Sequence, residues 1–374
     1  MNTAKIPYAM AIGNWLPYSE TFIYDQVKQA KKFEPYVLAR GLNPARENFP
    51  YDKVTSLGSW ERTLYYAALP SRKFVNVIRE SGAKFVHAHF GTNGALVSAT
   101  ARKADVPLIV TLHGVDVGIL LNKHIPIDYL FYKRTYKRMF ETAQLLLPAS
   151  QELANCLVQL GAPESKIQVH RLGVDTSAFT PFCRPERPAQ FLMIGRMVEK
   201  KGFEYGIRAF AKIADKHKES TLTLIGKGPL LEPLQSLAAE LGVQDKVIFK
   251  GSIPSAQMPE LLANYDVLVA PCIVAQNNDR DSGLIVLKEA GASAMASIGT
   301  FCGGLPEIID DGTTGMLVGQ REIDSLAECM DALASDYAFR TKMGAAARVK
   351  IENEYDTVRQ NEKLEEIFEA TLRG

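Results

Sequence analysis

The 374-residue sequence lacks several features that would place it in a specialised class. Its 43 Lys and Arg residues nearly balance 42 Asp and Glu residues, and the net charge of +1 creates no overall field that would recruit nucleic acid. No run approaches the ~18–20 apolar residues of a membrane-spanning helix, and no signal-type segment opens the chain. We therefore expect a cytoplasmic protein that is at most peripheral on the cytoplasmic face of a membrane.

Cysteine is also scarce, and its pattern argues against disulfide bonds. The five cysteines are odd in number, scattered, and contain no C-x-x-C pair, which suits a reducing compartment. Apolar residues make up 47% of the chain and charged residues 23%, as in soluble globular proteins. The length fits two domain cores better than one.

Short β-branched apolar runs alternate with helical patterns along the whole chain. Strands are predicted at 8–12, 36–39, 84–88, 107–111, 144–148, 190–194, 221–225, 246–250 and 266–270. This order predicts an α/β fold with two doubly wound parallel sheets, each covered by helices on both faces. The segment 171–190 has three prolines and few periodic apolar residues, so it is interpreted as a linker. We expect domains at 1–173 and 174–355, followed by an amphipathic helix within 356–374.

The run DSGLIVLKE, residues 281–289, places an acidic residue at each end of an apolar segment. A turn through Ser282 and Gly283 is predicted to open an apolar helix that continues through Ala292 and whose free N–H groups can hold an anion or a polar ligand. Asp281 is expected at the mouth of this helix and Glu289 roughly two turns inside it, where both could accept hydrogen bonds from a polyhydroxylated ligand. A buried helix with a capping Asp and one solvated Glu would show the same pattern.

Two glycine-containing stretches follow strands in the second half. In IGRMVEKKG, residues 194–202, Arg196 and Lys201 could converge on the oxygens of a diphosphate, although a basic surface turn would look similar. In IGKGPLLEPL, Gly226 and Gly228 lack the third glycine of a dinucleotide-binding fingerprint, which disfavours an NAD-dependent dehydrogenase. Ile253, after the next strand, could meet a nucleobase edge.

The first half carries candidate polar residues after its strands. GNWLPYSETFI (13–23) is read as a loop, in which Gly13 permits an unusual turn and Ser19 could cap the next helix. In TLHGVDV (111–117), His113 could bond a sugar hydroxyl or a backbone carbonyl, and Asp116 shares its loop. The pair in VHAHFG (86–91) would share a strand face, but no third zinc ligand is in view.

The stretch IDYLFYKRTYKRMF, residues 127–140, interleaves aromatic and basic side chains. On a helix this composition can rest on an anionic membrane surface. A core-facing aromatic stripe with a solvated basic side would give the same pattern. Peripheral membrane contact therefore stays open as a hypothesis.

Several of these motifs together resemble the retaining glycosyltransferases of family 4, which have the GT-B fold of two Rossmann-like domains facing a central cleft. The stretches 111–116, 195–202, 226–229 and 281–289 follow the order and spacing of that family, including its G-R-x3-K-K/R-G segment and its E-x7-E motif. Asp281 stands where the family usually has its first Glu. The SETFI segment (19–23) resembles a branch that assembles bacterial exopolysaccharides such as colanic acid.

The resemblance implies a hexosyltransferase that uses a nucleotide-diphosphate sugar, expected from family frequency to be a UDP-sugar, and a glycan or polyprenyl-linked acceptor. His113, Arg196, Lys201 and Asp281 would take part in catalysis, and the last helix would return to the first domain. The donor would meet Gly13, Arg196, Lys201, Gly226, Gly228, Ile253, Asp281, Ser282, Gly283, Leu284 and Glu289. The acceptor would lie beside Asn14, Ser19 and Asp116.

No metal or other cofactor is expected. Asp279-Arg280-Asp281 spells the D-x-D of a different glycosyltransferase fold that binds Mn²⁺, but a metal here would duplicate Arg196 and Lys201. Two other functions remain compatible with the same motifs, namely a nucleotide-sugar epimerase on this fold and a non-catalytic sugar-nucleotide-binding subunit.

Overall fold

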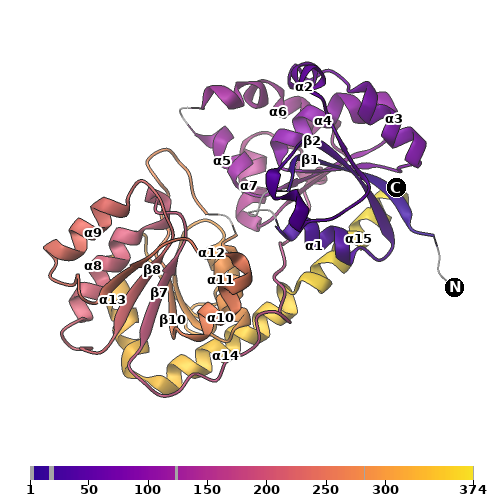
Figure 1. Ribbon diagram of the computed structural model, residues 1–374. Helices are drawn as coiled ribbons and strands as arrows, with labels where there is room; N and C mark the ends of the chain where they lie inside the picture. The colour runs from indigo at the N-terminus through magenta and orange to yellow at the C-terminus, as the bar shows by residue number, and fades with distance from the viewer. Residues whose placement is uncertain (1–3, 17–20, 123–124, 282, 374) are drawn as a thin grey trace. The chain divides into compact units, whose positions relative to one another are not determined.

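The computed structural model describes residues 4–16, 21–122, 125–281 and 283–373. The chain forms two compact units: unit 1 comprises Met1–Gly173 with Thr357–Gly374, and unit 2 comprises Val174–Asp356. Each unit contains a six-stranded parallel sheet with helices packed against it (Figure 1). The predicted α/β class with two parallel sheets is confirmed. The division falls at the predicted boundary, and the chain returns to unit 1 at Thr357.

Unit 1 has the strand order β3-β2-β1-β4-β5-β6. Its strands are β1 (Ile6–Trp15), β2 (Phe33–Leu42), β3 (Val54–Ser56), β4 (Val86–His89), β5 (Leu108–Leu112) and β6 (Leu145–Pro148). Its helices are α1 (Thr21–Gln29), α2 (Ser59–Tyr66), α3 (Arg72–Ser81), α4 (Gly91–Ala104), α5 (Val115–Leu121), α6 (Leu130–Thr142), α7 (Gln151–Gln159) and α15 (Thr357–Arg373). Short 3-10 turns lie at Pro44–Asn48, Ile127–Tyr129 and Glu164–Lys166.

Alternation along β1 buries both faces of the unit 1 sheet. Ala9 and Ala11 belong to the core on one face, whereas Tyr8, Met10 and Ile12 belong to the core on the other. Successive strand residues point to opposite sides, so a strand covered on both faces is apolar throughout. The second core is completed from the far end of the chain. In α15, which lies beside α1 in Figure 1, the ring of Phe368 is centred 4.7 Å from that of Phe85 and 5.4 Å from that of Phe33.

Unit 2 has the strand order β12-β11-β10-β7-β8-β9. Its strands are β7 (Gln190–Ile194), β8 (Thr221–Ile225), β9 (Val247–Lys250), β10 (Val267–Ala270), β11 (Ala296–Thr300) and β12 (Met316–Val318). Its helices are α8 (Phe203–Ile213), α9 (Leu231–Glu240), α10 (Met258–Ala263), α11 (Ile285–Ala292), α12 (Leu305–Ile308), α13 (Ile323–Ser335) and α14 (Tyr337–Glu354), and 3-10 turns lie at Glu199–Lys201 and Ser255–Gln257. In α8 the helical spacing of Phe203, Ile207 and Phe210 places all three in the core.

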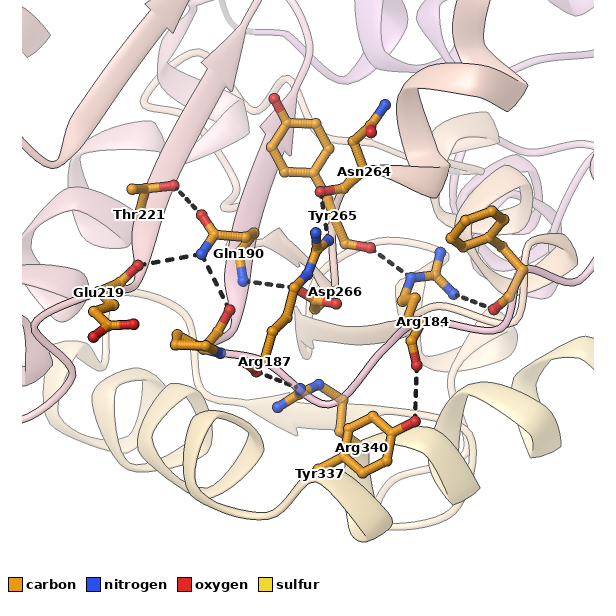
Figure 2. Close-up of polar contacts among 12 residues, drawn as sticks. Arg184, Arg187, Gln190, Glu219, Thr221, Asn264, Tyr265, Asp266, Tyr337 and Arg340 are labelled. Carbon is orange, nitrogen blue, oxygen red and sulfur yellow. Dashed lines mark hydrogen bonds and ion pairs between the residues drawn. The ribbon is translucent and has the colours of Figure 1, made fainter.

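The end of the predicted linker is fixed to unit 2 by buried polar contacts, which Figure 2 shows. The Arg184 guanidinium is buried and donates to the Tyr265 carbonyl oxygen at 2.5 Å, and burial lowers the pKa of Arg184 to about 10. The buried Asp266 carboxylate accepts from the Gln190 backbone N–H at 2.8 Å and from Arg187 Nε at 3.3 Å. These contacts fix the position of the segment that leads directly into β7.

Nine strands occur where the sequence pattern predicts them, but β1 is longer than predicted. The predicted strand ended at residue 12, whereas the parallel ladder with β2 continues through Asn14↔Gly41 and Trp15↔Leu42. Gly13 and Asn14 are therefore strand residues rather than loop residues. Three strands, β3, β11 and β12, were not predicted.

Candidate active site

The loops after β7 and β10 flank the point where the strand order of unit 2 reverses. The chain continues from β7 to β8 and β9 on one side of the sheet, whereas β10, β11 and β12 lie on the other side. Ligands of doubly wound sheets bind beyond the strand carboxyl ends at such a reversal. Arg196 and Lys201 follow β7, and Asp281 follows β10. Three predicted site residues therefore lie at this position.

Lysines from the first loop pair with aspartates from the second. Lys201 Nζ lies 3.0 Å from Asp281 Oδ2, and Lys200 Nζ lies 3.1 Å from Asp279 Oδ1 and 3.9 Å from Asp281 Oδ1. The Lys201 and Asp281 side chains are only 13% and 15% exposed, so the pair is shielded from bulk water. Residues eighty positions apart thus form one charge cluster. No role was predicted for Lys200.

Arg196 differs from the two lysines. Its side chain is exposed, and it forms no hydrogen bond or ion pair with any residue that the structure describes. It is therefore an exposed cation on the same loop as the two lysines, and its five N–H donors remain available to an anion. A diphosphate at this edge of the sheet would be the type of ligand that Arg196, Lys200 and Lys201 favour.

The glycines after β8 are required because two loops pass at backbone contact. A Cβ on Gly226 would lie 1.9 Å from the Gly195 carbonyl oxygen, and a Cβ on Gly228 would lie 2.3 Å from the Met197 carbonyl oxygen. Gly226 also has φ +144°, which side chains disfavour. The loops are joined by the bond from the Met197 N–H to the Lys227 carbonyl oxygen at 2.9 Å. The two glycines therefore fix the loop that carries Arg196.

Helix α11 begins at Ile285 and Glu289 is its fifth residue, so Glu289 lies about one turn inside the helix. The prediction of two turns was wrong by one turn. Within the described part of the chain, its carboxylate has no hydrogen-bond donor and no ion-pair partner, and burial raises its pKa to about 7. A desolvated carboxylate without a donor is an acceptor site for a ligand hydroxyl.

The remaining predicted donor residues have simpler surroundings. Gly283 is half-buried before α11, and Leu284 is buried at the position that precedes the first helical residue. Ile253 lies after β9, where it is half-buried and packs against one of the apolar cores of unit 2. Ser282 lies outside the described residues.

In unit 1, three histidines lie on β4 and just after β5: His87 and His89 are buried on β4, and His113 is half-buried in the loop that follows β5. His89 Nδ1 is 3.1 Å from His113 Nε2, and His87 Nε2 is 2.8 Å from Thr111 Oγ1. Burial lowers the pKa of all three, that of His89 to about 3, so the imidazoles are neutral at physiological pH. His113 Nδ1 has no hydrogen-bond partner in the described structure. The His89–His113 bond was not foreseen, because nothing in the sequence links the two loops.

Asp116 has a different role from the acceptor-side one predicted. Its carboxylate is fully buried and accepts from the N–H groups of Gly91 at 2.7 Å, Gly114 at 2.9 Å and Val117 at 3.1 Å. It therefore caps the starts of both α4 and α5, and its two oxygens are occupied. The acceptor-side prediction for Asp116 is corrected accordingly.

Asn14, predicted on the acceptor side, and Gly13, predicted as a donor contact, both lie on β1. Asn14 is exposed near the end of the strand, and a Cβ on Gly13 would lie 2.9 Å from the Arg40 guanidinium. Gly13 thus makes room for Arg40 rather than for a turn. Ser19 lies outside the described residues.

Comparison with family models matches nearly the whole chain. Residues 19–178 match the model of glycosyltransferase family 4, and residues 178–350 match the model of glycosyl transferases group 1. The second range contains the charge cluster, both glycines and Glu289. The first range contains the three histidines.

Curated relatives include enzymes of bacterial polysaccharide assembly. The chain is 27% identical to the putative colanic acid biosynthesis glycosyltransferase WcaL of Escherichia coli over 76% of the chain and 70% of that protein. It is 28% identical to the amylovoran biosynthesis glycosyltransferase AmsK of Erwinia amylovora over 75% and 69%. It is also 28% identical, over 68% of each protein, to a GDP-mannose-dependent alpha-(1-6)-phosphatidylinositol monomannoside mannosyltransferase of Mycolicibacterium smegmatis.

Solved structures with the same fold cover both units. A glycosyltransferase from Rickettsia africae superposes with a TM-score of 0.79 at 18% identity, covering 99% of both chains. Alr3699/HepE of Anabaena, crystallised in complex with UDP, gives a TM-score of 0.79 at 18% identity, covering 98% of this chain and all of that one. At this identity the likeness establishes the fold alone.

Proposed function

Since the chain belongs to the glycosyltransferases of family 4 and group 1, with the GT-B fold, we propose that it transfers a hexose from a nucleotide-diphosphate sugar with retention of anomeric configuration. The acceptor is a hydroxyl of a glycan or of a polyprenyl-linked sugar. The observation that carries this proposal is the cluster in which Lys200 and Lys201 meet Asp281, beside the exposed Arg196.

The cluster suits the departure of a diphosphate. In the transfer, the bond between the anomeric carbon and the diphosphate oxygen breaks, and negative charge grows on that oxygen. Arg196 and Lys201 would stabilise this charge without any proton transfer, as preorganised donors do at developing anions. The acceptor oxygen bonds to the anomeric carbon from the same face, and its proton passes to the departing phosphate oxygen.

The acidic residues would orient the rest of the donor. Glu289 has no partner among the described side chains and would accept hydrogen bonds from the ribose hydroxyls. Asp281 would accept a hydrogen bond from a hydroxyl of the donor sugar. Because Asp is one methylene shorter than Glu, this contact would be made either directly or through a water molecule. His113 is neutral and its Nδ1 has no hydrogen-bond partner among the described residues, so we propose that it bonds a sugar hydroxyl during catalysis.

We propose a reaction that needs no metal ion. The support is that both carboxylates of the D-x-D sequence are ion-paired, Asp279 with Lys200 and Asp281 with Lys201. A divalent cation at this position would have to displace two ammonium groups. Full activity in EDTA is the expected result, and activity that returns only with Mn²⁺ would contradict this part of the proposal.

For the donor we propose a UDP-sugar, with a GDP-sugar as the alternative. A structure with this fold holds UDP, whereas one relative is named for GDP-mannose, so the base needs a direct test. Thermal stabilisation by UDP, GDP and ADP separates the three, because a ligand at a hundred times its dissociation constant adds ~2.7 kcal/mol to the free energy of unfolding.

For the acceptor we propose an intermediate of surface polysaccharide synthesis, because WcaL and AmsK are named for colanic acid and amylovoran. A polyprenyl-linked acceptor would require peripheral contact with the cytoplasmic face of a membrane.

Three variants test the assignment as a whole. We expect donor turnover to fall strongly in Arg196→Ala, Asp281→Ala and Glu289→Ala. Near-normal rates in all three variants would refute the assignment. Product analysis with donor alone distinguishes the other two functions. A new nucleotide sugar would indicate an epimerase, and donor binding without turnover by any acceptor would indicate a binding subunit.

A further inference from the structure

Unit 1 has a surface on which large apolar side chains are exposed to solvent. On α2, Trp60 is 70% exposed and Leu64 is 47% exposed, and Leu69 follows the helix with 48% exposure. Of the eight residues of α2, only Tyr65 is buried. Such a helix gains little from packing on its own domain, and grouped apolar residues of this size mark an interaction surface.

A second part of the surface lies at the start of α6. Ile127 in the preceding 3-10 turn is 80% exposed, and Leu130 is 37% exposed. The two helices meet through an edge-to-face contact between Tyr66 and Phe131, with ring centroids 6.0 Å apart. This contact places the C-terminal end of α2 next to the start of α6, and both segments carry exposed apolar side chains. Figure 1 shows α2 and α6 on the same side of the unit 1 sheet.

The exposed side of α6 is strongly basic. Lys133, Arg134, Lys137 and Arg138 are all exposed, and none of them forms an ion pair with a described residue. Their spacing of three and four residues places them on one side of the helix. The whole chain carries a net charge of only +1, so four unpaired cations on one helix are a local concentration of charge.

We infer that this α2–α6 surface, comprising Trp60, Leu64, Leu69, Ile127, Leu130 and the four cations of α6, docks the protein on an anionic lipid bilayer. Aliphatic side chains and a tryptophan can enter the boundary between headgroups and acyl chains. Lys and Arg residues beside them are attracted to anionic headgroups.

A bilayer fits this combination better than nucleic acid does, because nucleic acid gives no apolar phase for exposed Leu and Ile side chains. No helix among the described residues is long and apolar enough to cross a bilayer, so attachment would be interfacial. The inference rests on the proposed function in one respect only: docking would bring the enzyme to a lipid-linked acceptor.

The test is cosedimentation of the full-length protein with phosphatidylcholine vesicles, with and without phosphatidylglycerol, at low and high salt. The unsubstituted protein is expected to bind the anionic vesicles at low salt and to be released by salt. In Lys137→Gln/Arg138→Gln, partitioning should fall about 25-fold, since each cation near an anionic surface multiplies it about fivefold. Trp60→Ser/Leu64→Ser should weaken binding at least tenfold and leave its salt dependence intact.

Matched variants remove exposed residues of the same kinds in unit 2. Ile248→Ser/Val349→Ser removes apolar residues that are 40% and 57% exposed, and Lys218→Gln/Lys342→Gln removes two exposed lysines. Both controls should bind vesicles as the unsubstituted protein does. Equal losses in the controls, or no binding of the unsubstituted protein to anionic vesicles at low salt, would overturn the inference.

Two further measurements keep the outcomes distinct. Binding of a single-stranded RNA that depends on the same residues and excludes vesicles would assign the surface to nucleic acid instead. Thermal stabilisation by nucleotide, measured on every variant, should be unchanged because unit 2 holds the donor residues. Vesicle binding without nucleotide binding would refute the proposed function and leave the docking surface intact.

Discussion

Replacing Glu289 by Gln is expected to make the unliganded protein more stable and the enzyme inactive. The half-buried carboxylate has a pKa of about 7 in the folded chain against an ordinary value of 4.5, because partial burial disfavours its charged form. Gln has nearly the same shape and no charge, so the substitution removes the cost of burying an ionised group. It also removes the acceptor proposed to hold the ribose.

The size and sign of the effect follow from linkage. Between pH 4.5 and 7 the unfolded chain has lost this proton and the folded chain retains it, so the free energy of unfolding falls as pH rises. Below pH 4.5 both states are protonated and the residue contributes nothing. Above pH 7 both are ionised, and the accumulated cost is 2.5 pH units at 1.36 kcal/mol each, or about 3 kcal/mol.

Urea unfolding at pH 5 and pH 8 measures this difference. Both tryptophans, Trp15 and Trp60, lie in unit 1, so circular dichroism is needed to follow unit 2 and fluorescence reports unit 1 separately. The free energy of unfolding of Glu289→Gln should exceed that of the unsubstituted protein by about 3 kcal/mol at pH 8 and by less than about 1 kcal/mol at pH 5. Glu240→Gln, at an exposed position of α9, is the matched control. A gain at pH 8 no larger than that of the control would refute the reasoning.

Three other substitutions test the site and its supports. Lys201→Ala should slow transfer about 10²–10³-fold, as the loss of one preorganised donor does, and a rate within threefold of that of exposed Lys218→Ala would contradict its role. Asp116→Ala leaves N–H groups of α4 and α5 without an acceptor and should destabilise unit 1 by ~3 kcal/mol; an unchanged fluorescence transition would exclude the capping role. Gly226→Ala should lower the stability of unit 2 well beyond Gly242→Ala, since both have positive φ but only Gly226 has a backbone oxygen within contact distance; equal losses would show that the close approach is not limiting.

The fold was predictable where strands contain large β-branched side chains and not where they are small or short. The core strands β5, β8 and β10 consist almost entirely of Leu, Ile, Val and Thr and were found. β11 has the sequence ASIGT and is fully buried, because its Gly299 is covered by Ile309 and Leu317. Its small side chains leave no apolar pattern to read. β3 and β12 have three residues each and pair on one side only, so tertiary pairing defines them.

For the candidate site, the sequence indicated which residues to consider but not which side chains they contact. Arg196, Lys201 and Asp281 could be chosen because their loops follow strands, but pairing of Lys200 with Asp279 depends on how two loops of different lengths fold back. Asp116 was assigned to the acceptor because a loop carboxylate looks available. The structure uses it for buried N–H groups of two helices, one of which begins 25 residues earlier in the chain.

The pairing of Asp281 with Lys201 also bears on why an aspartate can serve where the family usually has glutamate. The ion pair leaves hydrogen-bonding capacity on both side chains, because an ammonium has three donors and a carboxylate accepts at about four positions. Lys201 Nζ uses one donor at 3.0 Å from Asp281, which leaves donors for phosphate oxygens. Asp281 Oδ1 lies 3.9 Å from Lys200, beyond hydrogen-bond distance, and so retains capacity for a sugar hydroxyl. The short side chain therefore pairs with the lysine that we propose binds phosphate and still presents an acceptor oxygen, so under this proposal its distance from the sugar, rather than its charge, distinguishes it from glutamate.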